Sequence, residues 1–170
     1  MILKELFDSG ISFGEEFDKS DEAHREKAQE YMESMKISEE VINKVKSIDK
    51  KINILGFSEL WCPDCQINLS VMNYLTQLNE NINLKLQSIK GNEEVIKEHS
   101  DDGRVKVPLF IMLDKETNKL GAFVEVPSNV RKAEESDNQV ERIVAKKEYR
   151  KGKYMEQTIL DFLDIIENGQ

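Results

Sequence analysis

Short runs of hydrophobic residues divide the middle of the chain into β-strands. Residues 52–57 form a continuous run of mainly β-favouring side chains, which is typical of a buried strand. Residues 82–87 alternate between apolar and polar positions, and this period of two predicts a second strand. Two further apolar runs, 107–113 and 120–126, flank the polar segment 114–119 and predict a β-hairpin.

Apolar residues at helical spacing, together with the capping residues Ser20, Ser38 and Asn92, predict helices on both sides of these strands. The expected helices are a short one before residue 10, two in the polar N-terminal region at about 20–35 and 38–48, one at about 67–78, a short one at 92–99 and a final one around 159–166. Glycines at 10 and 14 indicate a turn over Ile11 to Glu16. Residues 128–153 are rich in charge and predict a loop, followed by a helix from about Val140.

The order of these elements predicts an α/β protein. With 170 residues the chain is expected to form a single domain, 1–170, around one core. Within it, residues 1–50 form a helical N-terminal extension, 51–127 a core of strands and helices, and 128–170 a C-terminal helical region. The expected sheet is central, mixed, of about four strands, and flanked by helices.

Composition narrows the classes of function. Hydrophobic residues make up 39% and charged residues 34%, and the net charge is −9. This acidity argues against a nucleic-acid partner, because phosphate-binding surfaces need concentrated positive charge. No apolar stretch is long enough to span a bilayer, and the first ten residues lack the pattern of a signal peptide. We therefore expect a cytoplasmic protein with no membrane partner.

The candidate chemistry lies in the two cysteines of the chain, Cys62 and Cys65. In a cytoplasmic protein such a pair is more often catalytic or metal-binding than structural. Because the pair follows a buried strand and opens a helix, the unpaired N–H groups of the helix favour a thiolate at Cys62. Cys62 is the predicted nucleophile and Cys65 the resolving thiol, with their reversible disulfide as the redox group and no further cofactor.

The alternatives for this cysteine pair are two buried structural thiols or half of a zinc site. Zinc needs four ligands, and His24 and His99 are the only histidines, with no second compact ligand pair, so we expect no metal site. Asp64, between the cysteines, places a negative charge near Cys62; it opposes the thiolate and favours a more reducing pair.

The order strand, Trp61-Cys62-Pro63-Asp64-Cys65, helix, strand, helix, Val107-Pro108 and hairpin resembles the thioredoxin superfamily. The resemblance implies a thioredoxin-like fold with a cis peptide bond before Pro108. It also implies that Val107 pairs with substrate backbone, and that Trp61, Pro63 and Asp64 belong to the substrate-binding surface. The implied activity is reduction of protein disulfides, with an external reductant such as a thioredoxin reductase.

Some features depart from that family. In standard thioredoxins a buried aspartate lies six residues before the nucleophile, and here that position is Gly56. Glu59 is the candidate replacement as proton acceptor. Glutaredoxins carry a Gly-Gly pair after the hairpin, and only Gly121 occurs here, which disfavours glutathione. The alternative of another class is a thioredoxin-fold redox sensor or adaptor that binds a partner through its N-terminal helices.

Overall fold

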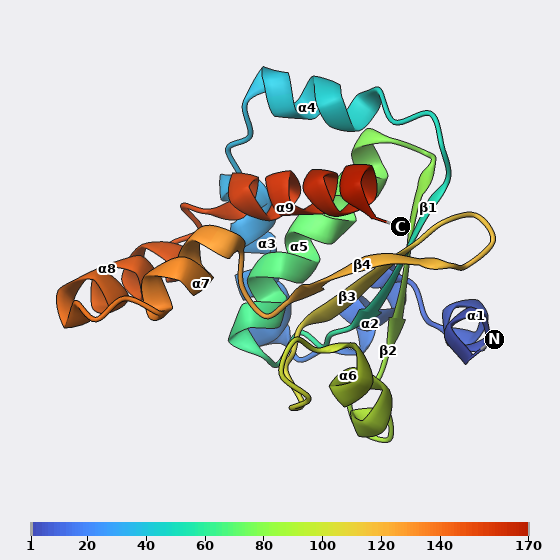
Figure 1. The fold of residues 1–170 in the computed structure, drawn as a ribbon, viewed down its shortest axis with the longest axis horizontal. Coiled ribbons are helices and arrows are strands. Elements are labelled where there is room, and N and C mark those ends of the chain that lie inside the picture. The colour runs from blue at the N-terminus through green and yellow to red at the C-terminus, as the bar shows by residue number, and fades with distance from the viewer. Residues whose placement is uncertain (1, 170) are drawn as a thin grey trace.

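The computed structural model describes residues 2–169, and within them a four-stranded mixed sheet carries helices on both faces (Figure 1). The strands are β1 (Ile52–Phe57), β2 (Ile82–Gln87), β3 (Leu109–Leu113) and β4 (Lys119–Val124). Their spatial order is β2-β1-β3-β4; β1 is parallel to β2 and antiparallel to β3, which is antiparallel to β4. The predicted α/β fold with a mixed sheet of about four strands is confirmed.

Helices from distant parts of the chain cover the two faces of this sheet. One face packs against α3 (Glu22–Ser34), α4 (Glu39–Lys46), α5 (Pro63–Leu78) and α9 (Met155–Asn168). The opposite face packs against α1 (Ile2–Ser9) and α6 (Glu93–His99). The N-terminal and C-terminal helices therefore complete the same core as the central strands, which explains why their apolar residues recur at helical spacing.

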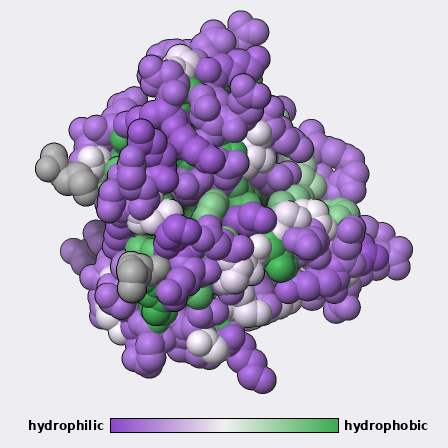
Figure 2. Space-filling model, turned by 90° about the vertical axis from the view of Figure 1, so that its right-hand side faces the viewer, coloured by the Kyte–Doolittle hydropathy of each residue, from purple (hydrophilic) through white to green (hydrophobic). Residues whose placement is uncertain are grey.

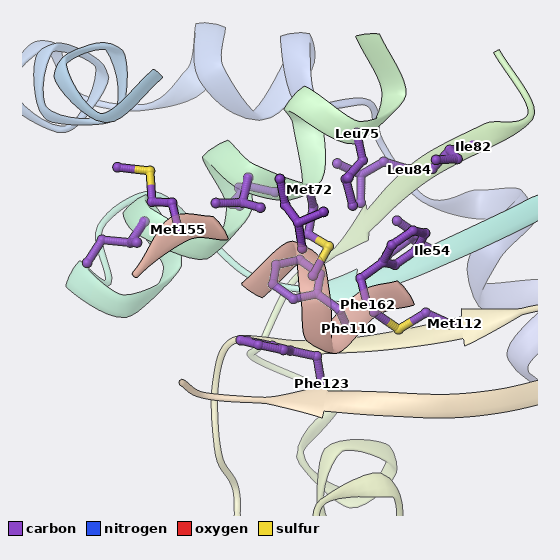
Figure 3. Packing of buried hydrophobic residues seen from close by; sticks show 14 of the residues in the cluster. Ile54, Met72, Leu75, Ile82, Leu84, Phe110, Met112, Phe123, Met155 and Phe162 are labelled. Carbon is purple, nitrogen blue, oxygen red and sulfur yellow. The ribbon is translucent and has the colours of Figure 1, made fainter. Parts of the chain in front are cut away.

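The larger part of the core lies between the sheet and the helices α5 and α9 (Figure 3). Ile54 and Phe110 project from neighbouring strands toward Met72 of α5 and Phe162 of α9, and all four side chains are fully buried. Burial of four such side chains contributes about 1.5–3 kcal/mol each relative to exposure. This packing fixes α5 against the sheet, and both cysteines lie at the N-terminal end of this helix.

The prediction of a turn over Ile11 to Glu16 is wrong, because residues 13–19 form the helix α2 (Phe13–Lys19). Ser12 caps this helix: its Oγ accepts a hydrogen bond from the Glu15 backbone N–H at 3.1 Å, and Glu15 Oε2 accepts one from the Ser12 N–H at 2.7 Å. This reciprocal capping box offsets the cost of starting so short a helix. Just before it, Ile11 forms an isolated antiparallel bridge with Leu86 of β2.

The prediction of a loop at the start of residues 128–153 is also wrong in part. Residues 128–134 form the helix α7 (Ser128–Glu134), whereas α8 (Gln139–Arg150) begins close to the expected position. Both helices extend away from the sheet (Figure 1). Tyr149 near the end of α8 is buried and joins the core, so the C-terminal end of this helix is fixed to the body of the protein.

Polar side chains dominate the surface around α1 and the β3–β4 turn, where hydrophobic atoms show only in small separate areas (Figure 2). This distribution agrees with the high share of charged residues. Among residues 2–169, no helix is both long and apolar enough to cross a bilayer.

Candidate active site

The candidate site lies at the edge of the sheet where β1 ends and β3 begins. Phe57, the last residue of β1, pairs with Leu109, the first residue of β3, and Leu109 also pairs with Val124 at the end of β4. This register brings the segment after β1, the Val107–Pro108 bond and the residue after β4 to the same edge. Glu125 continues the pairing, since its N–H donates to the Pro108 carbonyl at 2.8 Å.

Both cysteines lie at the start of α5, as the sequence predicts. Cys62 is the N-cap residue, Pro63 occupies the first turn, and Cys65 lies within that turn. Proline is well suited to this position, because its missing N–H would have no partner inside the helix. The Cys62 side chain is 8% exposed and Cys65 is fully buried; both are free thiols. Of the two sulfur-bearing residues, Cys62 is therefore the more accessible.

The surroundings of Cys62 favour its thiolate. The Cys65 thiol donates a hydrogen bond to it, and together with the backbone N–H groups of Cys65 and Asp64 this lowers the pKa of Cys62 to about 7, although burial and the Asp64 charge act in the opposite direction. With a pKa near 7, about half of the Cys62 side chains are ionised at neutral pH. The surroundings of Cys62 therefore favour its thiolate at neutral pH more than those of an ordinary cysteine do.

Cys65 has the opposite character. Burial, and then the hydrogen bond to Cys62, raise the pKa of the Cys65 thiol well above its usual value. Ser58 Oγ and the backbone N–H of Glu59 both lie against this sulfur and partly offset the rise in its pKa. Ser58 is fully buried, and no pattern in the sequence singled it out as part of the site.

The carboxylate of Glu59, the predicted proton acceptor, is bound elsewhere. Glu59 Oε2 accepts a hydrogen bond from the Ile89 N–H at 3.2 Å, and it is the backbone N–H of Glu59 that faces Cys65. A role for this carboxylate in proton transfer stays a prediction. The contact with Ile89 links the segment after β1 to the segment after β2.

Asp64 lies beside Cys62 and faces a cation that the sequence did not assign to the site. Its negative charge raises the pKa of Cys62, in the direction predicted, but hydrogen bonds from Cys65 outweigh this effect. Arg150 of α8 approaches Asp64 Oδ1 to 3.2 Å. The guanidinium reduces the field of the carboxylate at the sulfur, so the C-terminal helical region takes part in the electrostatics of the site.

A buried polar network supports the first turns of α5 from behind. Asn68 is fully buried, and its amide nitrogen lies 2.8 Å from Tyr149 Oη and 3.0 Å from the backbone carbonyls of Asp64 and Glu125. Its Oδ1 accepts a hydrogen bond from Thr158 Oγ1 at 2.9 Å. One side chain thereby connects α5, the end of β4, α8 and α9, and it holds Glu125 against the site.

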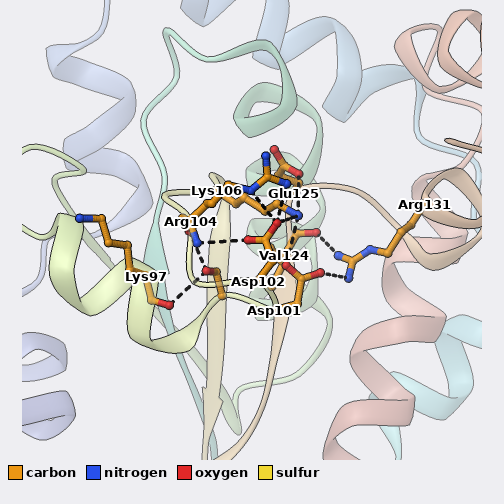
Figure 4. Close-up of polar contacts among 9 residues, drawn as sticks. Lys97, Asp101, Asp102, Arg104, Lys106, Val124, Glu125 and Arg131 are labelled. Atoms are coloured by element: carbon orange, nitrogen blue, oxygen red, sulfur yellow. Dashed lines mark hydrogen bonds and ion pairs between the residues drawn. The ribbon is translucent and has the colours of Figure 1, made fainter. Parts of the chain in front are cut away.

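The Val107–Pro108 peptide bond is cis, as the resemblance implies. The residues before it belong to an ion network (Figure 4). Lys106 Nζ lies 3.2 Å from Asp101 Oδ1 and 4.0 Å from Glu125 Oε2, and Arg131 of α7 donates to Asp101 at 2.6 Å. These pairs fasten the segment that precedes the proline to the end of β4 and to α7.

The residues predicted to contact a client differ in their exposure. The Trp61 side chain is 56% exposed, Pro63 is exposed, and Val107 is half-buried. A large aromatic side chain this exposed beside a nucleophile is suited to contact with a partner. Among residues 2–169, no group of three or more His, Cys, Asp or Glu side chains is arranged to hold a metal ion.

The fold, the dithiol at the start of α5 and the cis-proline at the same edge of the sheet define a thioredoxin-like protein. The profile of a family described as Thioredoxin matches residues 10–143, and the chain belongs to this family. The match includes most of the N-terminal helices, which the motifs in the sequence had left outside the resemblance.

Solved structures of similar shape cover nearly the whole chain. A crystal structure of a protein of unknown function from Pseudomonas aeruginosa is 30% identical, with a TM-score of 0.86 and 96% of each chain covered. The crystal structure of an HIV epitope scaffold is 29% identical, with a TM-score of 0.86 and 98% of each chain covered. Comparison with curated proteins gave no match.

Proposed function

We propose that the protein is a thiol-disulfide oxidoreductase that reduces disulfide bonds of client proteins. The observation that carries this proposal is the asymmetry of the dithiol. Cys62 has a pKa of about 7 at the mouth of the site, and Cys65, whose pKa is raised, is buried one helical turn behind it. A reactive outer thiolate and a protonated inner thiol are the starting state that a two-step exchange requires.

In the first step the Cys62 thiolate attacks one sulfur of the client disulfide. The client S–S bond breaks, a mixed disulfide forms with Cys62, and the first client sulfur leaves as a thiolate that takes up a proton. In the second step Cys65 loses its proton and attacks the Cys62 sulfur. The Cys62–Cys65 disulfide forms, the second client thiol is released, and two electrons have passed from the protein to the client.

The cycle needs a dithiol or an enzyme of the thioredoxin reductase kind to return the Cys62–Cys65 disulfide to thiols. We infer that reduction is the physiological direction and that the protein works in the cytoplasm. Two cysteines without a structural disulfide suit a reducing compartment. The charge of Asp64 next to Cys62 also favours the disulfide form of the pair, and hence donation of electrons to clients.

A turnover assay tests the proposal. The purified protein with dithiothreitol should reduce the interchain disulfides of insulin faster than dithiothreitol alone, and Cys62→Ser should abolish this acceleration. His99→Gln is a matched control, because His99 lies at the end of α6 and contacts Lys119 rather than the dithiol. No acceleration by the wild-type protein, together with a partner whose affinity changes with the redox state of the dithiol, would favour the sensor or adaptor instead.

A trapping experiment identifies the clients. Cys65→Ser should hold client proteins on Cys62 as mixed disulfides, because the second step then lacks its nucleophile. These adducts should be visible on non-reducing gels, and they should disappear with dithiothreitol and in the double variant Cys62→Ser/Cys65→Ser. Adducts held equally well by Cys62→Ser, in which Cys65 is the remaining thiol, would contradict the assignment of Cys62 as the attacking thiol.

A further inference from the structure

A charged side chain of the N-terminal helices is buried beside the redox site. Glu16 of α2 is 3% exposed, although glutamates are rarely buried without a partner. Its Oε1 accepts a hydrogen bond from the backbone N–H of Leu60 at 3.1 Å, and its Oε2 lies 3.0 Å from Lys19 Nζ. Leu60 lies two residues before Cys62, so this contact joins the N-terminal helices to the segment that carries the nucleophile.

The same segment is held from its other side by α5. The Leu60 carbonyl accepts a hydrogen bond from Gln66 Nε2 at 2.8 Å, and the Gln66 backbone N–H donates to the Cys62 carbonyl at 2.9 Å. Leu60 itself is fully buried. Its peptide group is thus fixed between a carboxylate of α2 and an amide of the helix that bears both cysteines.

The position of this segment determines what faces the Cys65 sulfur, whose thiol in turn donates to Cys62. Ser58 Oγ and the Glu59 N–H lie against Cys65, and the Cys62 N–H donates to the Glu59 carbonyl at 3.1 Å. A shift of the backbone at Leu60 would move these groups relative to both sulfurs. If its acceptor is lost, the buried Leu60 N–H is left without a hydrogen-bond partner. Because an unpaired buried donor costs free energy, the backbone at Leu60 is expected to shift.

The negative charge of Glu16 is not needed to hold the Leu60 N–H in place. The main influences on the Cys62 sulfur come from Cys65, from burial and from Asp64. Glu16 is partly neutralised by Lys19, and its contact with the redox segment is made to a backbone N–H. An uncharged acceptor of the same shape would satisfy the same donor.

We propose that Glu16 is a positioning residue of the redox site: by binding the Leu60 N–H it holds the Ser58–Trp61 segment in the geometry that gives Cys62 its reactivity. The N-terminal helix α2 then helps to position the residues of the redox site. The inference rests on the proposed function only in taking Cys62 as the nucleophile.

The test is the pH dependence of Cys62 alkylation by iodoacetamide in the reduced full-length protein, followed by site-resolved mass spectrometry. Glu16→Ala should lower the rate at pH 7 at least threefold and move the midpoint of the profile upward. Glu16→Gln, which keeps an oxygen acceptor for Leu60, should stay within twofold of the wild type. Glu15→Ala is the matched control: it removes the capping contact of the same helix without touching Leu60.

Several outcomes would overturn the proposal. One is a folded Glu16→Ala protein with the wild-type profile. Another is a Glu15→Ala protein with the same shift, which would trace the effect to the stability of α2. A third is a Glu16→Gln protein as impaired as Glu16→Ala.

If Glu16→Ala does not fold, Gln66→Leu tests the same peptide group from its other side. It should lower the alkylation rate in the same direction, and an unchanged profile would count against the proposal. Alkylation does not require a client. A chain that shows the expected shifts but fails to reduce insulin would therefore contradict the proposed function and leave the role of Glu16 standing.

Discussion

Arg150 of α8 lies 3.2 Å from Asp64, which lies two residues after Cys62, the predicted nucleophile. The two side chains are partly exposed, so the pair contributes little to folding free energy. Its effect is local: Asp64 raises the pKa of Cys62, and the guanidinium opposes the field of that carboxylate. The reactivity of the dithiol therefore depends on a helix about 90 residues further along the chain.

The first prediction distinguishes the effects of Asp64 and Arg150 on the pKa of Cys62. Asp64→Asn removes a negative charge near the sulfur and should lower the alkylation midpoint of Cys62 below about 7. Arg150→Met leaves the carboxylate uncompensated and should raise it. We expect shifts of about half a pKa unit each way, a factor of about three in thiolate fraction near neutral pH. Iodoacetamide alkylation across pH 5–9 measures both; a shift of the same sign in both variants would contradict the account.

The second prediction concerns the hydrogen bond from Cys65 to Cys62, the largest cause of the lowered pKa of Cys62. Because the thiolate is the reactive form, alkylation of the wild type should level off above pH 8 and fall about tenfold per unit well below pH 7. Cys65→Ala removes the donor and should move the midpoint toward 9. Cys65→Ser keeps a hydroxyl donor and should lie in between. A Cys65→Ala midpoint that stays at about 7 would show that the helix N–H groups alone stabilise the thiolate.

Local sequence patterns predicted the parts of the fold that depend on near neighbours. The alternation over 82–87 and the strand-to-helix step at Cys62 depend on residues close in the chain, and β2 and α5 form there. The seven-residue helices α2 and α7 were missed because they hold too few apolar residues to show a helical period; α6, of the same length, was predicted from its capping residue Asn92. The Ser12–Glu15 capping box was a visible signal for α2, but Gly10 and Gly14 led to the prediction of a turn.

The candidate site also contains some residues that local sequence patterns could identify and others that they could not. Cys62, Cys65 and Pro108 could be identified because one motif and one dipeptide carry them. Arg150 and Glu16 could not, because their contacts with Asp64 and Leu60 join residues far apart in the chain and exist only once the helices have packed. A charged residue in a polar N-terminal region gives no sign, by itself, that it will be buried.

The third prediction tests the polar network behind the site. Asn68→Leu conserves much of the volume but removes the partners of Thr158 Oγ1, Tyr149 Oη and the Glu125 carbonyl, all in a buried environment. We expect a loss of about 2–4 kcal/mol in the free energy of unfolding. Asn73→Leu, on the same helix but half-buried and bonded only to the Met32 sulfur within residues 2–169, should cost less than about 1 kcal/mol. Urea unfolding measures both, and equal losses would contradict the importance of the network.

The fourth prediction concerns Gly56, at the position where standard thioredoxins carry a buried aspartate. A Cβ atom built on Gly56 would lie 2.8 Å from Leu86 Cδ2 and 2.9 Å from the ring of Phe110. Such distances require the neighbours to move, so Gly56→Ala should cost about 1–3 kcal/mol of unfolding free energy. Gly56→Asp should cost more, since it also buries a carboxylate against apolar side chains.

A double variant distinguishes this crowding from a general intolerance of β1 to substitution. Phe110→Leu removes the ring atoms closest to the new Cβ, so the combination Gly56→Ala/Phe110→Leu should be more stable than the sum of the single losses predicts, by about 1 kcal/mol. Chemical unfolding of the four proteins in the cycle measures this coupling. Strict additivity would show that the Phe110 ring does not restrict position 56. It would also remove the steric reason why this chain has no acidic side chain at position 56.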